Sequence, residues 1–471
     1  MTIIINNINM IIWPYVLTYG LLAVGLYFTI KFKFIQFTHF KEMLNVLMSP
    51  VKEDNSGISP FQALSISLAS RVGTGNIAGV AVALYLGGPG AIFWMWLVAL
   101  LGMATAYSES TLAQLYKTKD KAGQSKGGPA FYIEKGLGLP WLAKVFTVLF
   151  LFMALVFSAL QSNSIASAMT GAFGLPNLLS GIVIVLFVAL IIYGGIQRIA
   201  SVAERLVPFM AAAYLLLALF VITSNISEVP ALLASIVSHA FGLNEAVAGT
   251  TGGVIAAMMN GVRRGLFSNE AGMGTAPHIA AIATPNPNHP SSQGFVQALS
   301  VFIDTIVICT ATAVMILLSN ALEPGSGITG IELTQKALTE HIGAAGAYFI
   351  AFCILLFAFT TILGIYSFIE ISVSYLIDSK KVLSVFKLLF LGITFWGTLQ
   401  TVSLVFNVAD AFMGIIASIN LVVIVLLSGT VKKLTLDYTG QRKKGNPKFD
   451  IQNYPELEGK IDHRVWGTSK D

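Results

Sequence analysis

The sequence predicts an all-α polytopic membrane protein, because the chain is long, strongly apolar and poor in charge. Of its 471 residues, 55% are hydrophobic and only 11% are charged, whereas soluble proteins carry about 25% charged residues. The apolar residues fall into separate runs of roughly 20 or more, the length that a helix needs to cross the hydrocarbon core of a bilayer. This composition argues against a nucleic-acid-binding protein, a secreted disulfide-rich domain and a soluble enzyme.

Eleven apolar segments predict eleven transmembrane helices. Loop residues such as Gly87–Gly90 and Pro285–Asn288 separate neighbouring segments. The segments cover residues 10–30, 59–86, 91–116, 141–173, 178–196, 206–225, 246–262, 295–322, 346–377, 382–406 and 408–430.

The distribution of basic residues predicts the orientation of these segments. With the N-terminus outside, the inner connections and the tail hold 26 of the 28 lysines and arginines, counting Arg263 and Arg264 as inner. Basic residues accumulate on the cytoplasmic side of membrane proteins. We therefore predict a multi-pass plasma (inner) membrane protein with its N-terminus outside and its C-terminus in the cytoplasm. The basic tail, residues 431–471, is predicted to be a solvated extension.

The segments divide into an isolated first helix and two groups of five. This predicts an N-terminal helix and cytoplasmic connection over residues 1–58, a five-helix repeat over 59–225, a second repeat over 226–430, and the tail. Because five is odd, the second group starts from the opposite side of the membrane. An inverted repeat of this kind is common in secondary transporters.

Glycine interrupts the leading segment of each group. The first contains Arg71–Asn76, with the sequence RVGTGN, and the second contains Gly249–Gly253, with the sequence GTTGG. Glycine weakens a helix by about 1 kcal/mol relative to alanine, and unwound backbone at membrane depth is tolerated only where it lines an enclosed cavity. We predict two broken helices whose free N–H groups bind a carboxylate and whose free carbonyls bind a cation. For Gly75 and Gly79 alone, close helix packing is the alternative.

Two polar clusters lie at membrane depth. Gln161 and Ser164 share one face of the 141–173 segment, where they could bind a small polar solute or join neighbouring helices. Thr360 and Thr361 could bond to their own helix, or complete an oxygen cage for a monovalent cation together with carbonyls of a broken helix.

Ionisable residues within membrane segments are functional candidates by default. For Arg71 and Asp304, the two that lie deepest, we favour a structural ion pair or helix-end contact over a proton relay. Residues 260–274 are rich in glycine yet apolar, which predicts a structured hairpin beside the cytoplasmic exit.

Several of these stretches resemble the alanine/glycine:cation symporter family, also called the sodium:alanine symporters. The match covers the ten core segments, and the GTGN and FSNEAGMG runs are long enough to be specific. The resembling stretches are Arg71–Gly79, Gly87–Gly90, Gly127–Gly136, Gln161–Ile165, Arg264–Gly274, His289–Gly294 with Gln297, and Thr361–Gly364.

The resemblance implies a leucine-transporter-type fold and sodium-coupled uptake of small neutral amino acids. It implies that Thr74, Gly75 and Asn76 surround the amino acid together with Thr250, Thr251, Gly252 and Gly253, while Gln161 lines the pocket, on the helix face that it shares with Ser164. It also implies a sodium position made by backbone carbonyls near Ala69 and Val72 and by the hydroxyls of Thr360 and Thr361.

One departure concerns specificity. Many family members have tryptophan after the Thr-Ile-Leu-Gly run, whereas this chain has Ile365. An isoleucine reshapes the expected pocket, so a larger substrate such as glutamine stays open.

The predicted partners are a small neutral amino acid, sodium and the lipid bilayer, with no nucleic acid, organic cofactor or catalytic residue. A proton-coupled transporter and a passive channel are the alternatives, and an intramembrane enzyme lacks a catalytic pair.

Overall fold

Helices form almost all of the regular structure in the computed structural model, which describes residues 2–48, 58–120, 123–242, 251–323, 325–445 and 447–467. A short ribbon joins β1 (Thr118–Lys119) to β2 (Ser125–Lys126) in antiparallel register, with Thr118 opposite Lys126. The predicted all-α class is therefore confirmed.

The longer helical elements follow the predicted segments closely. They are α1 (Thr2–Ile11) continued by η1 (Ile12–Leu17) and α2 (Thr18–Lys31), α7 (Gly90–Leu115), α9 (Pro140–Phe173), α10 (Asn177–Ile192), α11 (Gly195–Ser224), α13 (Thr251–Asn269), α15 (Pro290–Val301) continued by η4 (Phe302–Cys309) and α16 (Thr310–Leu317), α18 (Ala345–Leu376), α19 (Lys380–Thr398) and α20 (Val402–Leu426).

Shorter elements connect or extend them. They are α3 (Ile35–Thr38), α4 (Phe40–Leu47), α5 (Pro60–Arg71), η2 (Gly75–Gly79), α6 (Val80–Gly87), α8 (Pro129–Phe131), η3 (Tyr132–Gly136), α12 (Val229–Ala240), α14 (Ala276–Ile282), α17 (Gly330–Ile342), α21 (Ser428–Arg442), η5 (Ile451–Asn453), η6 (Pro455–Leu457) and α22 (His463–Trp466).

Eight helices among the described residues are long and apolar enough to cross a membrane, which confirms a polytopic membrane protein. The other three predicted segments correspond to α5 with η2 and α6, to the 16-residue α10, and to α13. Eleven crossings and an inverted repeat stay predictions.

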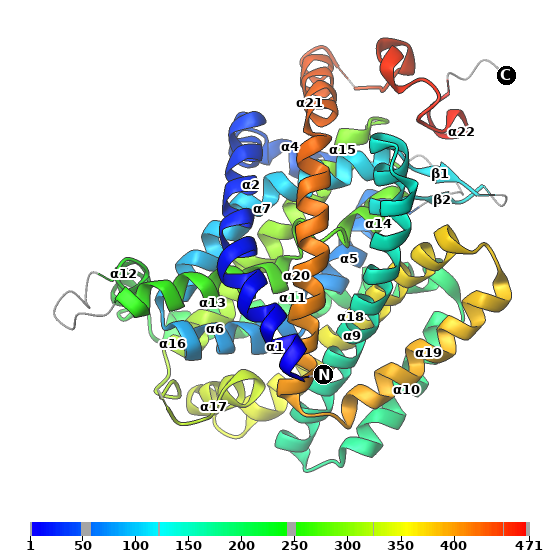
Figure 1. Cartoon of the computed structure of the whole chain (residues 1–471). Helices are drawn as coiled ribbons and strands as arrows, with labels where there is room; N and C mark the ends of the chain where they lie inside the picture. Colours follow the sequence, from blue (N-terminus) through cyan, green and yellow to red (C-terminus); the bar gives the residue numbers. More distant parts are fainter. Residues whose placement is uncertain are drawn as a thin grey trace.

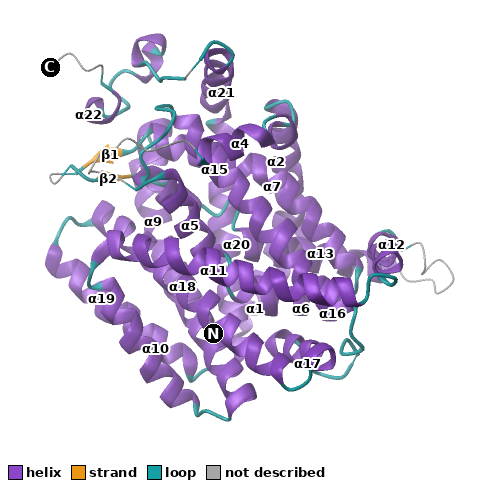
Figure 2. Ribbon diagram, turned by 180° about the vertical axis from the view of Figure 1, so that it is seen from behind, coloured by secondary structure: helices purple, strands orange, loops and turns teal. Residues whose placement is uncertain are grey.

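The two ends of the helical body carry different elements. Figure 1 shows α21, the β1–β2 ribbon and the C-terminal segment at one end, and α17 and the N-terminus toward the other. The view from behind shows the same separation (Figure 2). The chain termini therefore lie toward opposite ends of the body, as an odd number of crossings requires.

The tail is not the solvated extension that its basic composition predicts. α21 continues the direction of α20 beyond the helical body (Figure 1). Residues 447–467, which we call the C-terminal strap, then fold back over the ribbon, with Phe449, Tyr454, Leu457 and Trp466 buried. The prediction failed because it weighed the lysines and arginines of the tail and overlooked its spaced aromatic residues.

The long helix α9 packs against α18, α19 and α20. The contact with α19 is close, because a Cβ added to Gly397 would collide with the backbone of Ala159. A second glycine of α19, Gly392, has open space at the same position. An alanine at Gly397 therefore tests helix packing, whereas an alanine at Gly392 tests helix propensity alone.

We expect Gly397→Ala to lower the free energy of unfolding by about 1–3 kcal/mol, because the added methyl group overpacks the contact with α9. Gly392→Ala is the matched control, and we expect it to be neutral or to stabilise by up to about 1 kcal/mol. Thermal unfolding of both purified variants in one detergent measures the difference. Equal melting temperatures would contradict the proposed close contact.

Candidate functional site

Helix α5 begins at a well-defined cap and ends abruptly in the middle of its predicted segment. Ser59 and Gln62 form a reciprocal capping box at its start. At its end, Val72 is extended, with φ −73° and ψ 93°, and helical structure resumes at Gly75. We call residues 72–74 the first break. It lies within the predicted RVGTGN run.

The first break deprives the carbonyl groups of Ala69 and Val72 of their helical partners. In a continuous helix, the N–H of Gly73 would donate to the carbonyl of Ala69. Here it donates to Asn76 Oδ1 at 2.9 Å. The N–H of Asn76, which would otherwise donate to Val72, donates to Gly73 O at 3.2 Å. The carbonyls of Ala69 and Val72 are therefore left for another partner.

That partner is Thr361 of α18. Its Oγ1 lies 2.9 Å from Ala69 O and 3.3 Å from Val72 O, and also 2.9 Å from Phe357 O of its own helix. A hydroxyl has one hydrogen to donate, so it can satisfy one of these three carbonyls at a time. The cluster is a group of converging oxygens with too few donors, a composition that suits a hard cation.

Thr360, the fourth residue expected in this ion site, lies elsewhere. Its Oγ1 donates to Phe357 O at 2.9 Å and approaches Met210 Sδ of α11 at 3.7 Å. Successive helical residues point about 100° apart, so the hydroxyl of Thr360 faces α11 when that of Thr361 faces the first break. The structure brings together Ala69, Val72 and Thr361, and leaves Thr360 out.

Gln161 of α9 meets the first break from the other side. Its Oε1 accepts a hydrogen bond from the Thr74 N–H at 3.0 Å and another from Thr74 Oγ1 at 2.7 Å. A Cβ added to Gly73 would lie 2.5 Å from Thr361 Oγ1 and 2.9 Å from Gln161 Oε1. Glycine is thus required where the backbone passes between the two side chains. The prediction placed Gln161 and Thr74 at one site, and they are in direct contact.

Gly75 lies against α13. A Cβ at this position would lie 3.0 Å from Phe267 Cδ1 and 3.1 Å from the Ser268 α-carbon. The Phe267 ring is 5.3 Å from Phe157 of α9 and 5.7 Å from Phe406 of α20, centroid to centroid. Aromatic rings therefore enclose the first break closely.

Asn76 connects the first break to a buried carboxylate. Its Nδ2 donates to Asp304 Oδ1 at 2.7 Å, while Ser268 and Thr305 donate to Asp304 Oδ2 at 2.7 Å each. Asp304 lies in the π-helical stretch η4. Arg71, its expected ion-pair partner, donates instead to Ser300 Oγ and to Gln297 O.

The last two residues expected in the pocket are Ser164 and Ile365. Ser164 Oγ donates to Leu160 O of its own helix at 2.9 Å. Ile365 is buried in α18, directly after Gly364, where an added Cβ would lie 2.8 Å from Ser70 Cβ. The hydroxyl of Ser164 is therefore bonded within α9, and Ile365 lies in the same helix as Thr361, one turn further along.

The second interruption is not where the sequence predicts it. Thr250 lies outside the described residues, while Thr251, Gly252 and Gly253 open the continuous helix α13. At 1.5 Å per residue, Gly253 lies roughly 22 Å along the helix axis from Ser268. The predicted interruption at Thr251–Gly253 is therefore wrong, and their contact with the substrate stays a prediction. Glycine near a helix start is tolerated, which the prediction did not weigh.

The chain instead unwinds between α13 and α14, at residues 270–275, which we call the second break. Glu270, Gly272 and Gly274 have φ values of 55°, 89° and 81°. Residues 260–274 are thus a helix end followed by a buried turn, and the predicted cytoplasmic hairpin is wrong. The left-handed backbone at the two glycines explains the GMG sequence.

Glu109 of α7 holds the second break. Its carboxylate accepts hydrogen bonds from the N–H groups of Gly272 at 3.2 Å and Gly274 at 3.1 Å, and from Asn420 Nδ2 of α20 at 2.9 Å. Tyr132 OH in turn donates to Asn420 Oδ1 at 2.5 Å. The amide groups of this break are therefore already bonded to a carboxylate of the protein, and a carboxylate ligand would have to displace Glu109.

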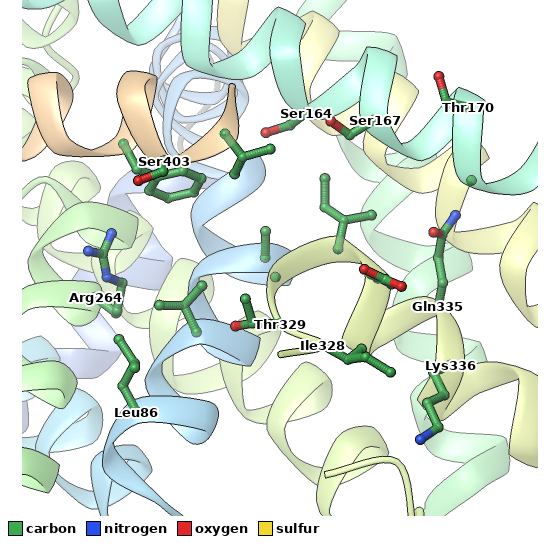
Figure 3. Close-up of a pocket in the computed structure, with 18 of the residues that line it drawn as sticks. Leu86, Ser164, Ser167, Thr170, Arg264, Ile328, Thr329, Gln335, Lys336 and Ser403 are labelled. Atoms are coloured by element: carbon green, nitrogen blue, oxygen red, sulfur yellow. The ribbon is translucent and has the colours of Figure 1, made fainter. Parts of the chain in front are cut away.

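A cavity of about 990 Å³ leads toward the first break, between α9, α17, α20 and α6. Ser164, Ser167 and Thr170, spaced three residues apart on α9, line one wall (Figure 3). Gln335 of α17 lies on the facing side. Gln161, which contacts the first break, lies one turn before Ser164 on the same helix.

Arg263 and Arg264 line this cavity and lie within α13, which corrects their assignment to a connection after the seventh segment. Both donate to Asp410 Oδ2, at 2.5 Å and 2.8 Å. The cavity also contains Lys336, the one basic residue predicted to lie in an outer loop. A guanidinium partway along α13 was mistaken for a loop charge because the predicted segment ended at residue 262.

Sequence reasoning missed Ser268, Glu109 and Asn420 as parts of the site. Ser268 lies within the FSNEAGMG run, which was singled out, but the run was assigned to a hairpin. Glu109 lies inside the predicted 91–116 segment, where nothing in the sequence pointed to a partner. Its partners come from the second break and from α20, far away in the sequence, and spacing alone could not identify them.

Known proteins resemble this chain along nearly its whole length. Residues 1–451 match the model of the sodium:alanine symporter family. The chain is 46% identical to the amino-acid carrier protein AlsT of Bacillus subtilis, over 97% of this chain and 96% of that protein. It is also 46% identical to the probable sodium/glutamine symporter GlnT of Bacillus subtilis, over 95% of this chain and 92% of that protein.

A more distant relative is the sodium/alanine symporter AgcS of Methanococcus maripaludis, which is 38% identical over 93% of this chain and 98% of its own length. The resemblance read from the motifs is therefore confirmed along nearly the whole chain. The family and its named members are transporters and not enzymes. This chain belongs to the sodium:alanine symporter family.

Proposed function

We propose that this protein is a sodium-coupled symporter that imports small neutral amino acids such as alanine or glycine by alternating access. Membership of the family and the names of its relatives support amino-acid symport. The observation that carries the sodium assignment is the oxygen cluster at the first break, where Thr361 Oγ1 lies within 3.3 Å of the carbonyls of Ala69 and Val72.

Sodium would bind between α5 and α18 at this cluster. A sodium ion there would bind the carbonyl oxygens of Ala69 and Val72, which lack N–H partners in their own helix. It would also hold α18 against the first break. The neutral oxygens around the site suit a monovalent ion that must later be released. Among the described residues, no cluster of three or more His, Cys, Asp or Glu side chains competes for this role.

The amino acid would bind with its carboxylate at the first break. The Thr74 N–H and hydroxyl, which now donate to Gln161 Oε1, are donors that a carboxylate can take over, and Gln161 would then turn its amide toward the substrate. Phe267 beside Gly75 leaves little space for a long side chain. This favours alanine or glycine over glutamine, although a relative is named for glutamine.

The distribution of basic residues favours one orientation of the protein in the membrane. Without Arg263 and Arg264, the inner connections and the tail still hold 24 of the 28 basic residues, which favours an outer N-terminus and a cytoplasmic C-terminus. The cavity beside α17 would then face outward. Rocking of two bundles about the breaks, in an inverted-repeat architecture of the leucine-transporter type, would open the opposite side.

Uptake by proteoliposomes tests the proposal. We expect labelled alanine to accumulate in the presence of a sodium gradient, and accumulation to cease when choline replaces sodium at constant pH. Unlabelled glycine should compete strongly and glutamine weakly. Unchanged uptake in choline would refute sodium coupling, uptake driven by a pH gradient alone would favour protons, and stronger competition by glutamine would refute the proposed substrate size.

Thr361→Ala should raise the sodium concentration for half-maximal uptake by roughly tenfold, which corresponds to the loss of about 1.4 kcal/mol from one ligand. Thr360→Ala is the matched control, because its hydroxyl contacts Met210 and not the first break. Sodium titration of alanine uptake measures both variants. Equal sodium dependence in the two would remove Thr361 from the ion site.

Gln161→Ala should change the KM for alanine, because Gln161 shares the donors of Thr74 with the substrate. Gln161→Glu should weaken binding further, since its negative charge would repel the substrate carboxylate. Thr147→Val, a buried change on the same helix whose hydroxyl donates to Ala143 O, should leave KM unchanged. If the three variants share one KM, Gln161 only joins helices.

A further inference from the structure

The C-terminal strap is bonded to three separate parts of the end of the molecule that it covers. Phe449 N donates to Asn288 O at 2.9 Å, ahead of α15. Asp462 Oδ2 accepts from Lys119 N of β1 at 3.2 Å. Trp466 Nε1 donates to Leu115 O, at the last residue of α7, at 3.1 Å. The strap therefore joins α7, the ribbon and the α14–α15 connection.

Aromatic packing fixes the strap in this position. The ring of Phe449 lies 5.1 Å from that of Trp466, 5.2 Å from that of Tyr454 and 5.9 Å from the imidazole of His289, between centroids. Phe449 and Trp466 are each only 4% exposed. A contact that buries this much aromatic surface is stabilising, so the strap belongs to the folded body.

Beneath Trp466 lies a buried lysine that extends the contact inward. Lys117 Nζ is 5.6 Å from the Trp466 ring centroid and donates to Ala283 O at 3.1 Å. Gln114 Nε2 donates to the same carbonyl at 2.8 Å. Lys117 is 3% exposed, and the strap shields its ammonium group from water. Trp466 thereby helps to hold Lys117, and Lys117 holds Ala283.

Ala283 is the point at which the inner halves of both interrupted helices meet. It directly follows α14, and it pairs in parallel with Ile58, which lies two residues before α5. Thr284 N donates to Ile58 O at 2.9 Å. A continuous series of contacts thus runs from Trp466 through Lys117 and Ala283 to the start of α5.

We propose that the C-terminal strap is a cytoplasmic latch that keeps the inner ends of α5 and α14 together and so opposes opening of the transporter toward the cytoplasm. The proposal rests on the alternating-access function and orientation proposed above. The family model ends at residue 451, so most of the strap, Trp466 included, lies outside the part of the chain that the model describes. Release of the strap would be a regulatory step that the transport site itself does not require.

Cysteine labelling tests the latch without relying on transport. The reporter is Ala283→Cys, a small change at a buried position, in inside-out vesicles treated with a membrane-impermeant maleimide. The native thiols of Cys309 and Cys353 are both buried, so the parent chain gives the background. Labelling of a buried thiol follows the population of the open form.

Adding Trp466→Ala to the reporter should speed its labelling by roughly tenfold, the factor that 1.4 kcal/mol in the opening equilibrium produces. Trp466→Phe, which keeps an aromatic ring but loses the N–H bond to Leu115, should give an intermediate rate. His463→Ala is the matched control, because His463 is exposed in the same helix α22. A chain ending at Asp450 should label at least as fast as the Trp466→Ala variant.

Equal labelling rates in the reporter, the Trp466→Ala variant and the truncated chain would overturn the latch, as would an equal increase caused by His463→Ala. Size-exclusion profiles identify any variant that does not fold. If Trp466→Ala does not fold, the labelling rate of the Trp466→Phe variant is compared with that of the reporter instead. Sodium-driven alanine uptake by the same variants is scored separately. A latch without uptake would disprove the proposed function alone, and uptake with unchanged labelling would disprove the latch alone.

Discussion

The structure depends on one constraint: every backbone polar group at membrane depth needs a partner, because lipid offers none. The two interruptions leave backbone N–H and carbonyl groups without helical partners. Buried side chains from distant helices form hydrogen bonds with these groups. Asn76, Gln161 and Thr361 serve the first break, and Glu109 with Asn420 serves the second. The burial of these five polar residues is explained by this requirement.

The two breaks are connected by hydrogen bonds to one buried side chain. Asp304 accepts hydrogen bonds from Asn76, which follows the first break, and from Ser268, which precedes the second. A rearrangement of one break therefore disturbs the bonds of the other. This coupling gives a physical route by which ion binding at α5 and α18 could be felt at α13, without any contact between ion and α13.

The sequence predicted the helical class and most helix positions well, because long apolar runs leave few alternatives. It also identified Thr74 with Gln161, and Thr361 with the carbonyls of Ala69 and Val72. The prediction failed where the type of a residue does not determine its backbone conformation. Gly252 and Gly253 looked like a break but start a helix, whereas Gly272 and Gly274 looked like a loop and form the break. Only the packing of α7 and α20 against residues 270–275 distinguishes the two cases.

Glu109 makes the two interruptions chemically unequal. The N–H groups of Gly272 and Gly274 in the second break donate to a carboxyl group of the protein, whereas the donors of Thr74 in the first break are shared with an amide. The two breaks therefore differ in the partners of their N–H groups, and a ligand carboxylate could replace an amide partner more readily than a carboxyl partner. On the function proposed above, only the first break would have donors to offer a substrate carboxylate, so the proposal implies one amino acid bound in each transport cycle.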